Sequence, residues 1–231
     1  KIPEWLNKLA ENKWLGDKTG QGFFKKTKNA AGEKEILTLD LATMEYGPRK
    51  KPKFAALEAA KPIDDLHTRL KMLFNSPDKA GEFYRLFHYN LFSYISNRVP
   101  EISDSLHSID NAMMTGFGWE IGAFESWDLL GVEKTVADMK KAGHKVATWV
   151  DEMLAAGYKT FFTIKDGKRL VYSPISKSLV SVYAPGQENA FIVMKHFEGQ
   201  TLWKNSACRT YHLGDDVLGL EWYTKMGSIG G

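Results

Sequence analysis

The stretch from Gly116 to Gly131 constrains the fold more than any other part of the chain, because it combines four glycines with four aromatic side chains. Glycine adopts positive φ without steric cost, so these glycines predict turns or close backbone approaches. The run 108–114 predicts a helix that ends at Gly116. After it, apolar residues at helical intervals predict a short second helix, at Ile121, Phe124, Trp127 or Asp128, and Leu130.

These two helices predict a helix-turn-helix corner. Phe117 and Trp119 fall between them and are expected to fill the junction. Phe124 and Trp127 fall on the apolar face of the second helix. We therefore expect all four aromatic side chains to be largely buried.

Composition bounds the class of protein. Of the 231 residues, 43% are hydrophobic and 26% charged, as in soluble globular proteins with a sizeable core. The net charge of +3 is too small to indicate nucleic-acid binding. It is compatible with a ligand that carries phosphates, although a mixed solvated surface explains it more simply.

The single cysteine, Cys208, excludes an intrachain disulfide and favours a reducing, cytoplasmic location. No apolar run approaches the roughly 18 residues of a membrane span.

The beginning of the chain predicts a helix over 3–15, followed by a glycine-rich loop. The loop does not fit a dinucleotide-binding loop, because a helix precedes it and Phe23-Phe24 begins an extended segment after it. We therefore interpret Lys18 and Thr19 as residues that position the loop rather than as phosphate ligands.

A hairpin is predicted next, over 23–46, where extended segments flank a turn at 29–32. The basic segment 47–53 is bounded by prolines and reads as a solvated linker. We expect a domain boundary there.

The middle of the chain predicts helices over 54–60, 63–74, 78–95, 132–141 and 147–156. In the longest of them, apolar residues recur at intervals of three and four and are predicted to form core: Phe83, Leu86, Phe87, Leu91, Phe92 and Ile95. His88 lies among them. We interpret it as a hydrogen-bonded core histidine rather than a catalyst.

Extended structure returns near the end. Residues 161–172 predict a hairpin with Asp166-Gly167 at its turn. Residues 207–222 predict two strands around Gly214-Asp215.

An internal repeat links the beginning of the chain to its later part. The helix that begins near Trp5 corresponds to the helix that begins near Trp149, and Lys18-Thr19 followed by Phe23-Phe24 corresponds to Lys159-Thr160 followed by Phe161-Phe162. Only the glycines between them are lost. The repeat predicts that the chain opens in the tail of one copy of a unit and contains a complete second copy.

The corner resembles a motif of the C-terminal domain of 3-hydroxyacyl-CoA dehydrogenases, roughly I-D-x-A-M-x-x-G-x-G-[FW]-x-x-G-P-F-E-L-x-D-x-x-G. The matching residues are Ile109, Asp110, Ala112, Met113, Gly116, Gly118, Trp119, Gly122, Phe124, Glu125, Asp128 and Gly131. Glu120 and Ala123 stand where many members have proline. These two departures loosen the turn and leave open whether this copy lines a substrate site.

Two other stretches carry related resemblances. The loop 15–24 is similar to the G-x-K-x-G-x-G-F-[YF] motif that closes the family's first C-terminal domain, and 207–227 resembles the opening strands of an enoyl-CoA hydratase (crotonase) domain. Lys225-Met226-Gly227 departs from that domain's K-M-N at the last residue.

Asn97 matches the asparagine that lies near substrate in the family's catalytic copy. The alternative, which we favour because a second copy is usually structural, is that Asn97 pairs backbone groups where its helix meets Pro100.

The resemblance implies a mainly α fold, a helical domain like the C-terminal domain of 6-phosphogluconate dehydrogenase, with short β-hairpins near the start and at the C-terminal end. It divides the chain into the tail of a first dehydrogenase repeat (1–46), a linker (47–62), a second helical repeat (63–172), and a connector with the start of a hydratase domain (173–231). Because the chain begins without methionine and stops after a strand, we expect a fragment of a longer, multifunctional enzyme.

The implied activity is that of an oxidoreductase of fatty acid β-oxidation, which transfers a hydride from a 3-hydroxyacyl-CoA to NAD. The family's catalytic histidine and glutamate belong to its NAD-binding domain. Here no histidine lies in the family's H-F-F-N-P setting, whether His67, His88, His107, His144, His196 or His212. No catalytic, cofactor-binding or metal-binding residue carries over, and we expect the chain alone to be inactive and to bind no NAD.

The implied partners are an upstream NAD-binding domain and a downstream hydratase domain in the same polypeptide, and an acyl-CoA substrate. Because little of the first copy is present, we also expect the helices at 78–95 and 108–114 to expose apolar surface and to form a homodimer.

Two other classes of function compete with this interpretation. One is a non-catalytic helical scaffold or interaction domain unrelated to CoA chemistry, which coding sequence for neighbouring NAD-binding and hydratase domains would exclude. The other is an enzyme whose site is not apparent from sequence, which would need a convergent polar pocket.

Overall fold

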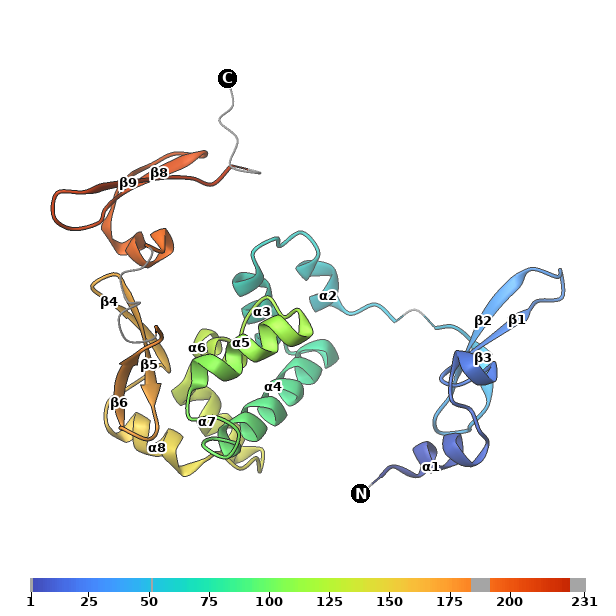
Figure 1. Cartoon of the computed structure of the whole chain (residues 1–231). Coiled ribbons are helices and arrows are strands. Elements are labelled where there is room, and N and C mark those ends of the chain that lie inside the picture. The colour runs from blue at the N-terminus through green and yellow to red at the C-terminus, as the bar shows by residue number, and fades with distance from the viewer. Residues whose placement is uncertain (1, 51, 184–191, 225–231) are drawn as a thin grey trace. The chain divides into compact units, whose positions relative to one another are not determined.

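The computed structural model describes residues 2–50, 52–183 and 192–224. Contacts divide the chain into two compact units, residues 1–54 and 55–231 (Figure 1). The boundary falls inside 47–62, and the assignment of the pieces to family domains stays a prediction. The expected K-M-G segment at 225–227 lies outside the described residues. Within the described part, no helix is long and apolar enough to cross a bilayer.

Unit 1 consists of a helix, a loop and a three-stranded antiparallel sheet. Its elements are α1 (Glu4–Glu11), η1 (Asp17–Thr19), β1 (Phe24–Lys28), β2 (Lys34–Leu39) and β3 (Tyr46–Pro48), with strand order β1-β2-β3. The expected hairpin is confirmed, and β3 extends it to three strands. Asn29 closes its turn, because the side-chain oxygen accepts the N–H groups of Ala31 and Glu33 at 3.0 and 2.9 Å. The first helix is shorter than expected, because Lys13 has a φ of 58° that helical backbone cannot contain.

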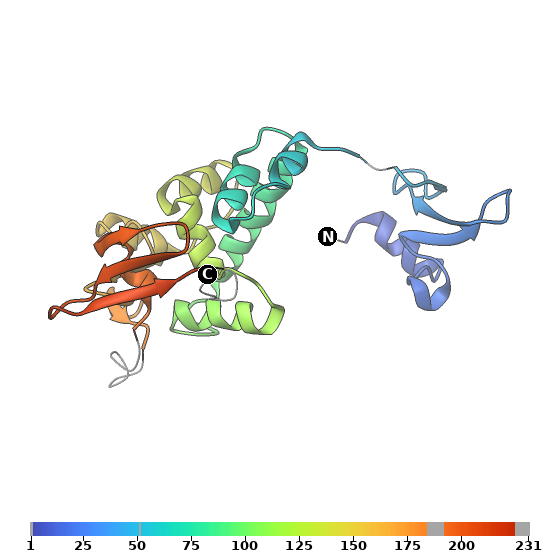
Figure 2. The same ribbon diagram turned by 90° about the horizontal axis from the view of Figure 1, so that it is seen from above.

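Unit 2 begins with the helical part of the chain, which Figure 2 shows from above. Its helices are α2 (Ala55–Ala60), α3 (Leu66–Asn75), α4 (Lys79–Asn97), α5 (Leu106–Phe117), α6 (Ala123–Leu130), α7 (Val132–Lys141) and α8 (Thr148–Ala155). Three of them begin at side chains that accept a backbone N–H of the first turn, namely Asp65, Asp78 and Ser105. All the expected helices are present in this part.

Two small antiparallel sheets follow. One contains β4 (Phe162–Lys165), β5 (Lys168–Ser173) and β6 (Ser178–Ser181); after η2 (Met194–Gln200), the other contains β7 (Thr201–Lys204), β8 (Cys208–His212) and β9 (Leu218–Trp222). The turn between β4 and β5 has positive φ at Asp166 and Gly167, 51° and 70°, as expected of this hairpin. Each expected hairpin gains a third strand. The chain is therefore a mixture of helix and strand rather than mainly α.

The core of unit 2 lies where the helices meet the β4–β6 sheet. The rings of Phe92 and Trp127 stack with centroids 4.6 Å apart, and Phe161 packs edge-on against Phe124 at 5.1 Å. Trp127 Nε1 donates to Thr135 Oγ1 at 2.5 Å, so the indole N–H is satisfied inside the core. Four aromatic side chains from three segments thus share one buried site.

The end of α5 differs from the expectation. The helix continues through Gly116 and ends at Gly118, which takes the left-handed conformation with φ 66°. Phe117 is consequently carried on the last turn and is 74% exposed, so its expected burial is wrong. Trp119 is partly buried, whereas Phe124 and Trp127 are fully buried as expected. Both glycines fit a helix end, and only the fold decided which of them ends the helix.

The expected core face of α4 is also partly wrong. Phe83 is 66% exposed, and Leu86 and Phe87 are exposed as well. The buried face is instead formed by His88, Tyr89, Phe92, Ile95 and Ser96, together with Ala80 and Gly81 at the start of the helix. Because α4 carries apolar residues on more than one face, periodicity alone did not indicate which face meets the core.

Candidate functional site

The corner between α5 and α6 is held by Asp110. Its side chain is 1% exposed, and its two oxygens accept the N–H groups of Phe124 and Glu125 at 2.8 and 2.9 Å. An aspartate on α5 thus caps the first turn of α6 from outside that helix. Gly122 lies against this carboxyl group, because a Cβ there would stand 2.3 Å from Asp110 Cγ. The glycine at this position is therefore needed for close approach.

A second aspartate connects α6 to the β4–β6 sheet. Asp128 Oδ1 accepts the N–H of Phe161 at 2.7 Å, and Oδ2 accepts the N–H of Phe162 at 2.9 Å. These donors come from the loop and first residue of β4, more than thirty positions later in the chain. One carboxylate thus fixes the beginning of the sheet on the helical corner.

An ion pair lies beside the two aspartates. Arg169 on β5 donates to Glu125 on α6, and its guanidinium group lies over the Phe162 ring, 4.4 Å from the centroid. Glu125 Oε2 also accepts the N–H of Gly122 at 3.2 Å. Both charged side chains are mostly buried. Asp110, Glu125 and Asp128 therefore all have partners.

Burial dominates the electrostatics of this corner. It raises the pKa of Asp110 to about 6 and the pKa of Asp128 to about 7, although the backbone N–H groups bonded to each carboxylate act in the opposite direction. The charge of Asp110 contributes to the raised pKa of Asp128. Burial lowers the pKa of His107, and nearby Arg169 adds to that lowering.

A cavity of about 660 Å³ opens beside the corner. Its lining mixes acidic, basic and apolar side chains from α3, the α5–α6 loop, α6, the β4–β5 hairpin, and η2 with the residue before it. These side chains are His67, Glu120, Ile121, Glu125, Asp128, Leu129, Phe162, Thr163, Ile164, Arg169, Val193, Lys195, His196 and Glu198. Among the described residues, no group of three or more His, Cys, Asp or Glu side chains is arranged to hold a metal ion. The cavity is a mixed polar and apolar opening next to the carboxylate network of the corner.

The residues singled out in the sequence lie in structural roles. Asn97 is exposed at the end of α4, and its amide donates to Ser93 O at 2.8 Å, one turn earlier, and to Lys145 O at 3.3 Å, 48 positions later in the chain. Whether Asn97 contacts substrate stays a prediction. His88 is buried, with its Nδ1 2.7 Å from Tyr84 O, so the core interpretation is confirmed.

In the loop of unit 1, Thr19 Oγ1 accepts the N–H of Leu15 at 2.9 Å and lies 3.2 Å from the carbonyl oxygens of Gly16 and Gln21. This confirms its role in positioning the loop.

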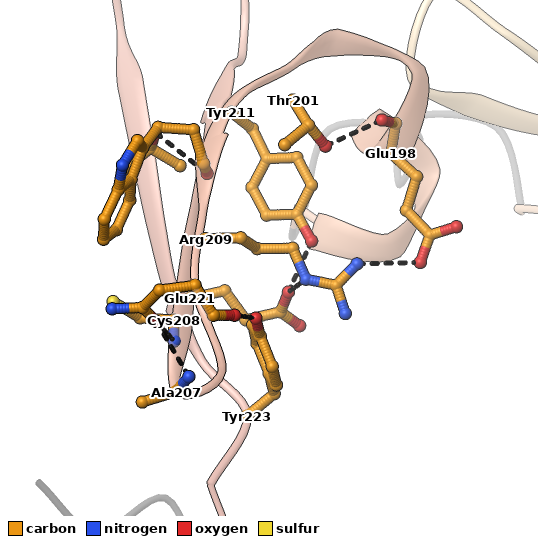
Figure 3. Close-up of polar contacts among 11 residues, drawn as sticks. Glu198, Thr201, Ala207, Cys208, Arg209, Tyr211, Glu221 and Tyr223 are labelled. Carbon is orange, nitrogen blue, oxygen red and sulfur yellow. Dashed lines mark hydrogen bonds and ion pairs between the residues drawn. The ribbon is translucent and has the colours of Figure 1, made fainter.

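A second polar cluster, on the β7–β9 sheet, was not expected from the sequence (Figure 3). Arg209 forms ion pairs with Glu221 at 3.2 Å and Glu198 at 3.1 Å, and its guanidinium group lies 4.6 Å from the centroid of the Tyr223 ring. Burial and a hydrogen bond to Glu221 raise the pKa of Tyr211 to about 12. Arg209 and Glu221 are direct cross-strand partners, so their opposite charges were the available signal once the register was known.

This cluster borders a second opening, of about 560 Å³, lined by Glu198, Thr201, Leu202, Trp203, Lys204 and Arg209. The arginine that would attract an anion is already paired by two carboxylates. The cluster therefore ties η2 to the sheet.

Comparison with known proteins gives related sequences but no matching family model and no matching solved structure. A protein of Bacillus subtilis (strain 168), named "Probable 3-hydroxyacyl-CoA dehydrogenase", is 36% identical over 234 residues, which cover all of this chain and 28% of the relative. Two proteins named "Putative fatty acid oxidation complex trifunctional enzyme" are similar over 120 residues, 24% identical in Rickettsia prowazekii (strain Madrid E) and 26% in Rickettsia felis (strain ATCC VR-1525 / URRWXCal2). These alignments cover 52% of this chain and 15% of each relative. The chain thus spans about a quarter of the length of the first relative.

Proposed function

We propose that the chain serves a 3-hydroxyacyl-CoA dehydrogenase as a helical substrate-side and packing segment. The proposal is supported by its 36% identity, over the full chain, to a part of the Bacillus subtilis relative named "Probable 3-hydroxyacyl-CoA dehydrogenase". The proposed reaction is the oxidation of a (S)-3-hydroxyacyl-CoA by NAD in fatty acid β-oxidation. The names of the Rickettsia relatives place similar segments in fatty acid oxidation enzymes with several functions. A cytoplasmic location, suggested by the single cysteine, is part of the proposal.

The carboxylate network of the corner supports the packing part of the proposal. Asp110 and Asp128 each hold two backbone N–H groups, and Glu125 pairs with Arg169. A general base needs an accessible acceptor aimed at substrate, and these three carboxylates are instead occupied in joining α5, α6 and the β4–β6 sheet. The corner therefore supports packing rather than proton transfer.

NAD does not fit the part of the chain that the structure describes. Dinucleotide-binding folds use a parallel sheet with a glycine-rich turn between a strand and a helix. Every strand pairing among the described residues is antiparallel. We therefore assign NAD binding and the catalytic groups to a different domain of the dehydrogenase and derive no step through NAD here.

The proposal extends to the finer architecture. We assign 63–172 to a helical domain like that of the 6-phosphogluconate dehydrogenase C-terminal domain, and 173–231 to a connector and the beginning of a hydratase domain. The exposed side chains of Phe83, Phe87 and Tyr94 recur at helical spacing on α4 and support a packing role for that helix. In the isolated chain we assign this face to a homodimer.

Replacement of the matched segment in the Bacillus subtilis relative by this chain tests the proposed function. We expect the chimaera to retain NAD-dependent oxidation of a 3-hydroxyacyl-CoA, and the chain alone to leave NADH unchanged when mixed with acetoacetyl-CoA. A relative carrying a Gly-Ser linker in place of the segment is the inactive baseline. A folded chimaera with no more activity than this baseline would contradict the dehydrogenase role and favour the scaffold alternative.

A further inference from the structure

The end of α1 repeats the end of α8 in detail. The backbone N–H of Trp14 donates to Leu9 O at 2.9 Å, and the backbone N–H of Tyr158 donates to Met153 O at 3.1 Å. Leu9 and Met153 are the buried residues at equivalent positions, five before these donors. Residues 4–48, from α1 to β3, are called the first module here, and residues 148–181, from α8 to β6, the second module. The two helices end in the same way although the following loops differ in length.

The aromatic contacts of the two modules also agree. The rings of Trp5 and Phe23 lie 5.8 Å apart at 63° in the first module. The rings of Trp149 and Phe161 lie 5.8 Å apart at 63° in the second. Phe23 and Phe161 therefore occupy equivalent places on the module surface.

The three-stranded sheets continue the correspondence. The backbone N–H of Leu39 donates to Phe23 O at 2.9 Å, and the backbone N–H of Tyr172 donates to Phe161 O at 2.7 Å. The strand order and the antiparallel pairing of β1-β2-β3 match those of β4-β5-β6. The sequence repeat thus extends through complete modules of the same fold.

The second module packs on the helices of unit 2. Phe161 is fully buried and packs against Phe124 and Trp127, with centroids 5.1 and 5.2 Å away. Trp149 Nε1 donates to Ser96 O at 2.9 Å. Asp128 accepts both backbone N–H groups at the beginning of β4. One face of this module is therefore covered by a helical corner with an aspartate at its centre.

The same face of the first module is open. Phe23 is 48% exposed, where Phe161 is fully buried, and Phe24 is 53% exposed. No hydrogen bond of the Phe23 N–H is found among the described residues. Because the backbone N–H of Leu39 donates to Phe23 O, Phe24 and Thr38 form a non-hydrogen-bonded pair of the β1–β2 ladder, and the Phe24 N–H points away from β2. The Phe23 and Phe24 rings are thus exposed and neither N–H group bonds to β2, while Phe24 O, on the outer edge of β1, accepts the N–H of Gly22 at 3.0 Å.

We propose that the first module is a docking surface for a second helical corner built like α5–α6, whose aspartate accepts the N–H groups of Phe23 and Phe24. The occupant must offer an aromatic pocket for Phe23 and a backbone carbonyl for the indole N–H of Trp5. The corner of unit 2 meets these requirements, but its Asp128 is already bonded to the second module. The occupant is therefore a further helical domain with the same corner chemistry. This inference rests on the repeated geometry and does not depend on the dehydrogenase assignment.

Exchange of the two modules within the full chain tests the proposal. In this variant, residues 4–48 take the place of 148–181 and the reverse, so the first module is offered the corner with Asp128. Peptides from the two modules differ in sequence, so hydrogen exchange measured by mass spectrometry distinguishes them. We expect protection of the Phe23 and Phe24 amides to rise by at least about tenfold, and protection of the Phe161 and Phe162 amides to fall by a similar factor.

A control chain carries a Gly-Ser linker in place of residues 148–181. If the chain with swapped modules has the same melting temperature and the same hydrogen-exchange rates as this control, the first module does not recognise the corner and the proposal is wrong. Asp128→Asn in the exchanged chain is the second variant. The amide side chain replaces one acceptor oxygen by a donor, so it should remove the new protection of Phe23 and Phe24; unchanged protection would overturn the predicted aspartate contact.

The unaltered chain distinguishes the occupant. We expect exchange of the Phe23 and Phe24 amides to be fast at every protein concentration, because the required corner is not free. Protection that increases with concentration would mean that a second copy of this chain covers the face, which would overturn the assignment to a further helical domain.

Discussion

At the scale of single residues, this protein uses carboxylates as connectors between distant backbone groups. Asp110 joins α5 to the first turn of α6, and Asp128 joins α6 to β4. Each side chain satisfies two N–H groups that would otherwise be buried without partners, and an unpaired buried donor costs about 1–3 kcal/mol. The same burial makes the charged form of each carboxylate unfavourable, which links the stability of the corner to pH.

Stability should therefore depend on pH through Asp128. Its pKa is raised from 3.8 to about 7 in the folded state, so the folded chain binds more protons than the unfolded chain between these values. The contribution of Asp128 is fully present below about pH 4 and is lost as pH rises through about 7, by an amount on the order of a few kcal/mol. We therefore expect the difference in unfolding free energy between the wild type and Asp128→Asn (wild type minus variant) to decrease as the pH rises from about 4 to about 7.

The measurement is urea denaturation of both proteins at pH values from 4 to 8. His88 and His107 have lowered pKa values, so they contribute in the opposite direction, but they are present in both proteins. Glu120→Gln, which removes an exposed carboxylate, serves as the control substitution. A difference between wild type and Asp128→Asn that is flat or rises with pH would contradict the buried-carboxyl account.

At the scale of elements, the end of α5 shows how two neighbouring glycines take different roles. Gly116 lies inside the helix, where an added Cβ would meet no atom within 4 Å. Gly118 ends the helix in the left-handed conformation, which residues with a Cβ rarely adopt. The helix therefore ends where backbone geometry requires glycine, and not at the first glycine in the sequence.

Alanine at the two positions should change stability in opposite directions. Gly116→Ala should stabilise the protein by about 0.5–1 kcal/mol, because alanine is the better helix former and the site has room. Gly118→Ala should destabilise it by about 1 kcal/mol, because a Cβ is strained in the left-handed region. Urea denaturation of the two variants at one pH measures both effects. A loss of stability in Gly116→Ala would mean that α5 ends before that residue.

At the scale of the whole molecule, α4 and the end of α5 in unit 2 carry exposed aromatic side chains. Phe83, Phe87 and Tyr94 share a face of α4, and Phe117 is exposed at the end of α5. Burial of apolar surface is favourable by roughly 25 cal/mol per Å². Such a face is most simply covered by the same face of a second copy in a two-fold dimer.

Sedimentation at micromolar concentration tests the dimer. We expect a mass near twice the 26.1 kDa of one chain, because association would remove these side chains from water. Phe83→Glu with Tyr94→Glu should return the protein to a monomer, since two charges would have to be buried at the interface. Leu202→Glu, at an exposed position on β7, is the control. A monomer whose mass does not change with concentration would reject the dimer.

The sequence by itself determined the local features of this protein. Helical spacing and glycine positions located the α5–α6 corner and the helices of unit 2, and Asp166-Gly167 located a hairpin turn. The repeat of Trp5 at Trp149, and of Phe23 at Phe161, revealed the two modules. These features were predictable because they depend on backbone preferences and on periodicity within a few residues.

Only the tertiary structure decided which face of α4 is buried, which glycine ends α5, and that each predicted hairpin gains a third strand. It also decided the roles at the candidate site. Asp128 was visible as part of a motif, but its partners at Phe161 and Phe162 lie 33 and 34 positions away. The pairing of Arg169 with Glu125 spans 44 positions. Contacts of this kind depend on how separate elements pack, so local sequence patterns carry no signal for them until the fold brings the residues together.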